Sequence, residues 1–309
     1  MSSAKDLRPD PDLPVELKDA ALNGRLVIFV GAGASMLVGM PSWSGLASKA
    51  LEDLRDKGAI NYAELQQLKG LDPKKQLSIA KLVASENKHD LKLDQYLKSN
   101  GSSRIYETLN SIGATCVTTN YDHELTPEYT EKVDASKTKP ETNRISGVEN
   151  LKSHHLKNPG TVIHLHGDMA SPETMIVATK DYLEHYDHEN VQHFLKELFE
   201  TKVVLFVGYG LEEAEILEHI LRRSGIREQE KERSRFALQP FFNSEQPLYG
   251  RLIEYYKKSF GVHLIGYTRD FKDYKQLEKI MNDWSSELDI RPPTLVDDIA
   301  DIDRVIADE

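Results

Sequence analysis

The chain has 309 residues, enough for one large domain or two smaller ones with a sizeable core. Apolar residues make up 39% and charged residues 29%, the balance of a folded globular protein rather than a disordered one. The formal net charge of −11 argues against a dedicated binder of nucleic-acid phosphates. Cys116 is the single cysteine, which excludes a disulfide framework and any zinc site built on two or more cysteines.

The first residues contain prolines and acids where a signal peptide needs an apolar stretch, so a cytoplasmic protein is expected. Residues 1–19 are interpreted as an N-terminal leader, loose over its first 15 residues. Residues 26–48 carry no charge and are long enough to cross a bilayer, but glycines, serines and a proline interrupt them. We interpret this segment as a short buried strand followed by a glycine turn, and expect no contact with a membrane.

Short runs of apolar, β-branched-rich residues recur along the chain, which is typical of strands buried on both faces. These runs are 26–30, 116–119, 161–165, 203–207 and 262–265. Helical patterns lie between them, and the clearest places five apolar residues on one helix face. The patterned residues are Val191, Phe194, Leu195, Leu198 and Phe199; then Leu211, Ala214, Leu217 and Leu221; and then Tyr274, Leu277, Ile280, Met281 and Trp284. Alternating strands and helices predict an α/β fold, with a Rossmann-like parallel sheet, helices on both faces, and ligands at the carboxyl ends of the strands.

Three stretches depart from that alternation. Residues 45–112 read as successive helices and are interpreted as a helical insertion. Residues 123–160 form a long, mostly polar loop outside the sheet, and a solvated loop is favoured over a nucleic-acid patch. The acidic tail 290–309 has apolar residues at helical spacing. We expect this stripe either to pack on its own domain or to form a contact in an oligomer or with a partner protein.

Two glycine turns follow predicted strands. The first, Gly31-Ala32-Gly33-Ala34-Ser35, would let backbone N–H groups approach a pyrophosphate, although Met36 stands where the dinucleotide fingerprint has a third small residue. The second, Val207-Gly208-Tyr209-Gly210, would suit the other half of a dinucleotide. The alternative for both is a tight turn that serves packing alone.

Polar side chains follow two further strands. Asn120 and Asp122 could hold a ribose hydroxyl, a water or a carboxamide, or could form an Asx turn that caps the next helix. Spacing alone leaves both readings open.

Histidines end the run at 161–165. His164 and His166 point the same way if the strand continues, and a histidine is the natural general base near neutral pH. A zinc site with Asp168 is the disfavoured alternative, because no other segment offers matching ligands; His185, His188 and His193 are expected on an exposed stretch.

In this order, these segments resemble the sirtuin-like family, specifically its bacterial branch of NAD-hydrolysing domains associated with antiphage defence. The resemblance spans residues 20–270 and rests on the two glycine turns and on Gly39-Met-Pro-Ser-Trp43, Thr119-Asn-Tyr-Asp122, His164-Leu-His166-Gly167 and Lys180-Asp-Tyr182. It implies a sirtuin-like NAD-binding domain over residues 20–289, with NAD⁺ as substrate. It also implies that Asn120 contacts the nicotinamide ribose and water, that Asp122 holds the nicotinamide amide, and that His166 is the base. The implied NAD-binding residues are Gly31, Ala32, Gly33, Ser35, Trp43, Thr119, Gly208 and Tyr209.

Departures from the family pattern shape the expected activity. Protein-deacylating sirtuins carry four zinc-binding cysteines after their histidine, whereas this chain has none after position 116, so no metal is expected. Trp43-Ser44 also replaces the phenylalanine and arginine usual in deacylases. We therefore expect an NAD⁺ hydrolase that releases nicotinamide and ADP-ribose; the alternatives are a non-catalytic sensor of NAD or ADP-ribose and a zinc-free deacylase. The resemblance further implies a homo-oligomer or partners such as DNA-translocase ATPases or Argonaute-type proteins, with any DNA contacted by the partner.

Overall fold

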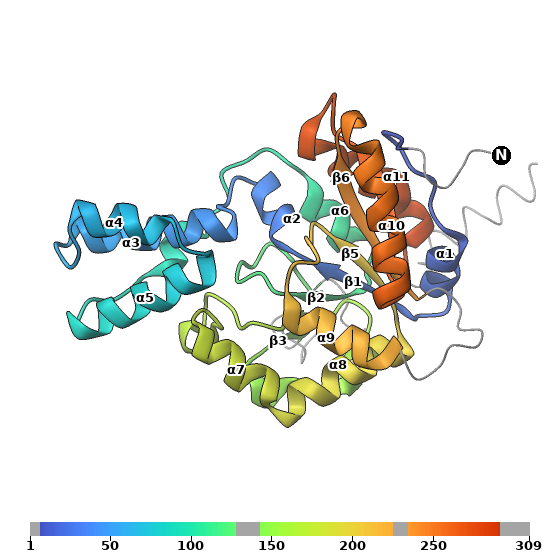
Figure 1. Ribbon diagram of the computed structural model, residues 1–309. Helices are drawn as coiled ribbons and strands as arrows, with labels where there is room; N and C mark the ends of the chain where they lie inside the picture. The colour runs from blue at the N-terminus through green and yellow to red at the C-terminus, as the bar shows by residue number, and fades with distance from the viewer. Residues whose placement is uncertain (1–6, 128–142, 225–233, 291–309) are drawn as a thin grey trace, which may run out of the picture.

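The computed structural model describes residues 7–127, 143–224 and 234–290. Its centre is a sheet of seven parallel strands in the order β3-β4-β2-β1-β5-β6-β7 (Figure 1). The strands are β1 (Leu26–Val30), β2 (Thr115–Thr118), β3 (Arg144–Ser146), β4 (Val162–His164), β5 (Val203–Val207), β6 (Arg235–Phe241) and β7 (His263–Thr268). The predicted Rossmann-like parallel sheet is confirmed.

The helices are α1 (Val15–Leu22), α2 (Ala32–Leu37), α3 (Trp43–Asp56), α4 (Tyr62–Lys69), α5 (Pro73–Glu86), α6 (Ile105–Ser111), α7 (Thr179–Asp187), α8 (Glu189–Thr201), α9 (Ala214–Ser224), α10 (Gln246–Phe260) and α11 (Gln276–Leu288). Single 3₁₀ turns are η1 (Leu93–Tyr96), η3 (Val148–Asn150), η4 (Ser153–Lys157), η5 (Pro172–Thr174), η6 (Asn243–Glu245) and η7 (Asp273–Lys275). The uncharged segment 26–48 forms β1, α2 and the start of α3, and no helix of the described ranges is both long and apolar enough to span a bilayer.

Both faces of the sheet are covered because successive strand residues point to opposite sides. In β1, Leu26, Ile28 and Val30 pack with α1, α6 and α11, whereas Val27 and Phe29 pack with α7 to α10. The five apolar residues predicted on one face of α8 are all buried there. Each central strand is therefore apolar on both sides, which explains its unbroken apolar run.

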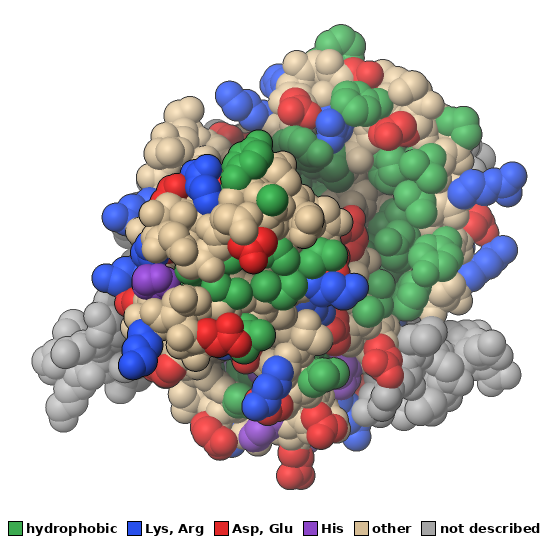
Figure 2. Space-filling model, turned by 60° about the vertical axis from the view of Figure 1, so that its left-hand side comes forward, with side chains coloured by type: hydrophobic (Ala, Val, Ile, Leu, Met, Phe, Trp, Pro, Cys, Tyr) green, Lys and Arg blue, Asp and Glu red, His purple; other side chains and the backbone are tan. Residues whose placement is uncertain are grey.

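Helices α3, α4 and α5 form a lobe beside the sheet (Figure 1). The lobe has a hydrophobic core of its own, which includes Leu51, Leu65 and Leu77. Each of its helices begins at a capping side chain that accepts a backbone N–H: Ser42, Asn61 and Asp72. The remaining helix of the 45–112 stretch, α6, packs on the sheet with α11 instead. Acidic and basic side chains are interspersed on the lobe side of the molecule, with a hollow beside the lobe (Figure 2).

The prediction of a loose leader is wrong for the described part, residues 7–15. The Trp284 indole N–H donates to the Pro11 carbonyl at 3.2 Å, and the Gln276 amide donates to the Pro9 carbonyl at 2.7 Å. Arg8 also bridges to Tyr267 of β7. Residues far away in the sequence hold this segment, so its local composition gave no sign of order.

The long loop 123–160 is also less separate from the sheet than predicted. Within its described part, residues 144–146 add the edge strand β3, which pairs with β4. Leu151 and Leu156 are buried against the helices of the adjacent face. Residues 128–142 and the tail from 291 lie outside the described residues.

The sequence patterns missed β6 and misplaced two helix starts. β6 contains Pro240, which pairs only with β7 because the pairing with β5 ends at Ala237. Leu211 precedes α9 with a φ of 54°, a left-handed conformation that a helix does not continue through. Tyr274 lies in η7 and is exposed, outside α11.

Candidate active site

The predicted site residues follow four neighbouring strands. Because all strands are parallel, the carboxyl ends of β4, β2, β1 and β5 meet at one sheet edge. After β1 the chain adds β2, β4 and β3 on one side of β1, and it then adds β5, β6 and β7 on the other side of β1. The boundary between β1 and β5 is therefore the topological switch point, where parallel sheets of this kind bind ligands. The structure thus brings together Gly31–Ser35, Asn120, Asp122, His166 and Gly208–Tyr209.

The two glycine turns interlock at that boundary. A Cβ added to Gly31 or Gly33 would lie 2.7 or 2.8 Å from the Gly208 carbonyl oxygen. The Gly33 N–H donates to the same oxygen at 2.8 Å, and Gly208 itself has a φ of +62°. Close packing of the two turns therefore accounts for these glycines, while α2 begins immediately at Ala32.

A chain of hydrogen bonds joins the first turn to the residues after β2. The Ser35 hydroxyl donates to Asp122 Oδ2 at 2.7 Å and lies 2.9 Å from the Tyr106 hydroxyl. The Asn120 amide donates to the Gly31 carbonyl at 3.0 Å and to the Tyr106 hydroxyl at 3.4 Å. Since Ser35 gives its only proton to Asp122, Tyr106 donates to Ser35 and accepts from Asn120. Asn120 thus ties β2 to the glycine turn and does not cap a helix.

Burial governs the charge of this group. Desolvation raises the pKa of Asp122 despite the hydrogen bonds from Ser35 and the Glu124 N–H. Desolvation and the neighbouring Asp122 likewise raise the pKa of Tyr106. The Asx-turn alternative is partly realised, because Asp122 accepts from the N–H two residues on.

The strand does not continue to His166, because β4 ends at His164, and the two histidines contact different partners. Arg144 donates to His164 Nε2 at 2.7 Å, so the other ring nitrogen, Nδ1, donates to the Asn120 carbonyl at 3.0 Å. Burial lowers the pKa of His164 to about 4. His164 is therefore a neutral ring that holds the Asn120 backbone in place. Arg144 has a structural role at this ring, which the prediction of a solvated loop did not include.

His166 faces a different set of partners. Its Nε2 atom lies 2.8 Å from the Tyr186 hydroxyl and 3.1 Å from Glu213 Oε1. The Tyr209 hydroxyl donates to Glu213 Oε2 at 2.7 Å. Sequence reasoning missed Tyr186 and the role of Glu213; their only sequence signal is a tyrosine one turn after Tyr182 and an acid just after the second glycine turn.

The expectation that His185 is exposed is wrong, because it is 4% exposed within α7. Its ring packs edge-on against His166, with ring centroids 5.7 Å apart. Burial and the nearby His166 lower the pKa of His185 to about 3. Tyr182 packs edge-on against His166 as well, at 5.1 Å, so the histidine stands between aromatic rings.

The zinc alternative has no geometry to support it. Asp168 bonds to His123 at 3.1 Å, while His164 and His166 face other partners. Among the described residues, no group of three or more histidine, cysteine, aspartate or glutamate side chains is arranged to hold a metal ion.

The lobe contributes Trp43, which begins α3 and lies 6.1 Å from the Tyr121 ring. Tyr121 in turn donates to the Ile176 carbonyl at 2.6 Å. Thr119, between β2 and Asn120, is half-buried. Trp43 therefore links the lobe to the residues that follow β2.

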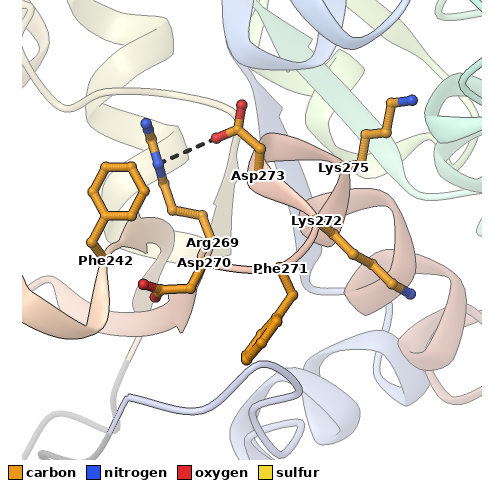
Figure 3. A pocket seen from close by; sticks show the side chains of 7 residues that line it. All are labelled: Phe242, Arg269, Asp270, Phe271, Lys272, Asp273 and Lys275. Atoms are coloured by element: carbon orange, nitrogen blue, oxygen red, sulfur yellow. Dashed lines mark ion pairs between the residues drawn. The ribbon is translucent and has the colours of Figure 1, made fainter.

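A separate hollow opens at the ends of β6 and β7. There the Arg269 guanidinium lies 4.1 Å from the centroid of the Phe242 ring and pairs with Asp273 (Figure 3). It also lies 4.2 Å from the centroid of the Tyr274 ring. None of the predicted site residues lines this hollow. Its lining has three basic residues against two acids, and it carries no part of the predicted NAD site.

Comparisons with known proteins point to the same family as the sequence motifs. Residues 114–265 match the model of the SIR2-like domain. The chain is 25% identical over 205 residues to Defense-associated sirtuin 2 of Bacillus subtilis, covering 63% of the chain and 19% of that protein. It is 25% identical over 237 residues to the NAD(+) hydrolase ThsA of Bacillus cereus, covering 70% of the chain and 44% of that protein. With ThsA of Cytobacillus dafuensis it shares 31% identity over 206 residues, 63% of the chain and 37% of that protein.

The fold thus defines an α/β protein with a Rossmann-like parallel sheet. Within that class, the predicted resemblance to the defence-associated sirtuin-like family is confirmed. The chain spans less than half the length of each of these relatives.

Proposed function

We propose that this chain is an NAD⁺ hydrolase that cleaves the bond between nicotinamide and ribose, giving nicotinamide and ADP-ribose. The observation that carries the proposal is the meeting of Asn120, Asp122 and His166 with two glycine turns at one sheet edge. The relatives named NAD(+) hydrolase ThsA support the same chemistry.

NAD⁺ would lie across the β1/β5 boundary, with its pyrophosphate over the backbone of Gly31–Ser35 and Gly208–Tyr209. Asp122 would hold the nicotinamide carboxamide. A carboxylate has about four acceptor positions, and Ser35 and the Glu124 N–H use two, so a carboxamide N–H can be accepted as well. Trp43 and Thr119 would line the nicotinamide end from the lobe side.

Bond cleavage leaves positive charge on the ribose ring, so the site must stabilise an oxocarbenium-like state and position a water. The amide nitrogen of Asn120 is already engaged with Gly31 and Tyr106, which leaves its oxygen to orient the water or a ribose hydroxyl. His166 would accept the proton as the water attacks. The buried aromatic surround of His166 excludes bulk solvent from that step.

The Bacillus subtilis relative is named as a defence-associated protein. We extend a role in defence to this chain and propose that it depletes cellular NAD⁺ during phage infection. An enzyme of this kind needs a trigger, since uncontrolled turnover would starve its own cell. We therefore include in the proposal a homo-oligomer or a partner protein, of the DNA-translocase ATPase or Argonaute type, as the source of control.

The deciding experiment incubates the purified chain with NAD⁺, with and without an acetylated peptide, and measures nicotinamide release and NAD⁺ binding. Release that does not depend on the peptide is the expected result. Binding without release would favour a sensor, and release only with peptide would favour a deacylase. Neither binding nor release, in the isolated chain and in its assembled forms, would refute the proposal.

A further inference from the structure

Glu213 is a largely buried carboxylate whose three hydrogen-bonding partners come from three separate segments of the chain. Its side chain is 15% exposed. The Tyr209 hydroxyl donates to Oε2 at 2.7 Å, the Tyr186 hydroxyl donates to Oε1 at 3.1 Å, and His166 Nε2 lies 3.1 Å from Oε1. Burial acts to raise the pKa of Glu213, but His166 and the two tyrosines outweigh it and hold that pKa below its ordinary value. The Glu213 side chain is therefore ionised, and its two oxygens act only as hydrogen-bond acceptors.

Counting protons around this carboxylate fixes the state of the histidine. Tyr186 has one hydroxyl proton and gives it to Glu213, so its oxygen must accept at the 2.8 Å contact with His166 Nε2. Nε2 therefore carries a hydrogen. The opposite arrangement would set an unprotonated Nε2 against the carboxylate at 3.1 Å, two acceptors facing each other. In a neutral imidazole, the proton on Nε2 leaves Nδ1 as the basic nitrogen.

We infer that Glu213 is a positioning residue that holds His166 in its Nε2–H form, so that Nδ1 is the atom that accepts the proton in NAD⁺ cleavage. The role of Nδ1 rests on the proposed function, whereas the protonated form of the ring does not. Once Nδ1 takes the proton, Glu213 stabilises the resulting imidazolium without being protonated itself.

Other groups near the histidine do not replace this carboxylate. His185 faces it from α7 as a neutral ring, and Tyr182 from the same helix presents an aromatic edge. The Lys74 ammonium lies over the Tyr182 ring, 3.8 Å from its centroid, and forms an ion pair with Glu215. The carboxylate in contact with His166 is that of Glu213.

The first test needs no activity: ¹H–¹⁵N correlation spectra of the ¹⁵N-histidine-labelled full chain, with His166 assigned by the loss of its signals in His166→Gln. We expect the Nε2–H pattern for His166. An Nδ1–H pattern would overturn the inference. If the chain released no nicotinamide at all, the proposed function would fail while this result still decided the tautomer.

The second test compares Glu213→Gln with Glu212→Gln, the same change at the adjacent, exposed glutamate. For Glu213→Gln we expect kcat for nicotinamide release to fall about 100-fold, the lower end of what a positioned base contributes, while KM stays within about threefold. Glu212→Gln should match the unchanged chain, and Tyr186→Phe should lower kcat in the same direction as Glu213→Gln. A kcat for Glu213→Gln within about threefold of the unchanged chain would overturn the inference; should that variant not fold, the spectrum of the unchanged chain decides alone.

Discussion

The site has two sides, each built around one buried carboxylate, and the two carboxylates are held in opposite ways. On the glycine side (Ser35, Tyr106, Asn120 and Asp122), burial prevails and the pKa of Asp122 is raised. On the histidine side (His166, Tyr186, Tyr209 and Glu213), the pKa of Glu213 is lowered.

The difference lies in the donors. Asp122 receives one serine hydroxyl and one backbone N–H, whereas Glu213 receives two phenol hydroxyls and an imidazole that can become positive. Burial alone therefore does not set the charge of a carboxylate; its donors do. The glycine side suits binding of a neutral carboxamide, and the histidine side suits proton transfer.

The largest expected effect comes from removing the side chain that ties the end of β2 to the first glycine turn. Asn120→Ala deletes the amide that bonds to Gly31 and Tyr106 and the oxygen assigned to the water. We expect nicotinamide release to fall by about 100-fold or more, because a misplaced nucleophile loses its attack geometry. Asn87→Ala, at an exposed asparagine that bonds only locally, is the matched control; undiminished release by Asn120→Ala would refute its role.

The interlocked turns predict a loss of stability on the glycine side. In Gly33→Ala the new Cβ would meet the Gly208 carbonyl oxygen at 2.8 Å, and we expect the free energy of unfolding to fall by about 1–3 kcal/mol in urea denaturation. Gly250→Ala is the control with opposite sign: a Cβ at this position in α10 meets nothing within 4 Å, so about 0.5–1 kcal/mol of stabilisation is expected. Equal effects of the two changes would contradict the tight packing of the turns.

The raised pKa of Asp122 predicts a pH dependence with a definite sign. Below its ordinary value of 3.8 the group is protonated in both states; as pH rises, the unfolded chain ionises first and the native state loses stability until the folded pKa is passed. Asp122→Asn removes this titration. The stability of the unchanged chain relative to Asp122→Asn, measured by urea unfolding, should therefore fall as the pH rises above 3.8; a rise would mean that Asp122 is held like Glu213.

The smallest expected effect concerns the link between the lobe and the histidine side. Lys74 of α5 lies over the Tyr182 ring and pairs with Glu215 at 2.7 Å, with both side chains of the pair more than a quarter exposed. Lys74→Met should lower the free energy of unfolding by less than about 1 kcal/mol. Lys75→Met, whose ion pair with Asp72 is more exposed, is the control, and a loss several times larger for Lys74→Met would show that the lobe supports the histidine side.

Local patterns predicted the central strands well because these strands are apolar on both faces. β1 and β5 match the predicted runs to the residue, and the five-residue stripe of α8 is buried as expected. β6 was missed because a buried Arg235 and Pro240 interrupt its apolar character. Arg235 is accommodated only because its guanidinium reaches the Phe199 and Phe260 carbonyls, contacts that no local pattern reveals.

The site, like the fold, was predicted where local sequence patterns suffice and was missed where contacts between distant residues decide. The sequence by itself determined which polar residues follow the strands, since the ends of parallel strands share one edge, and so placed Asn120, Asp122 and His166 together. Only the tertiary structure decided that His164 is bound by Arg144, that His185 is buried, and that Glu213 faces His166. Charge and tautomer depend on contacts between residues 20 to 47 positions apart, here from Arg144 to His164 and from His166 to Glu213, and such contacts exist only once the sheet and its helices have packed.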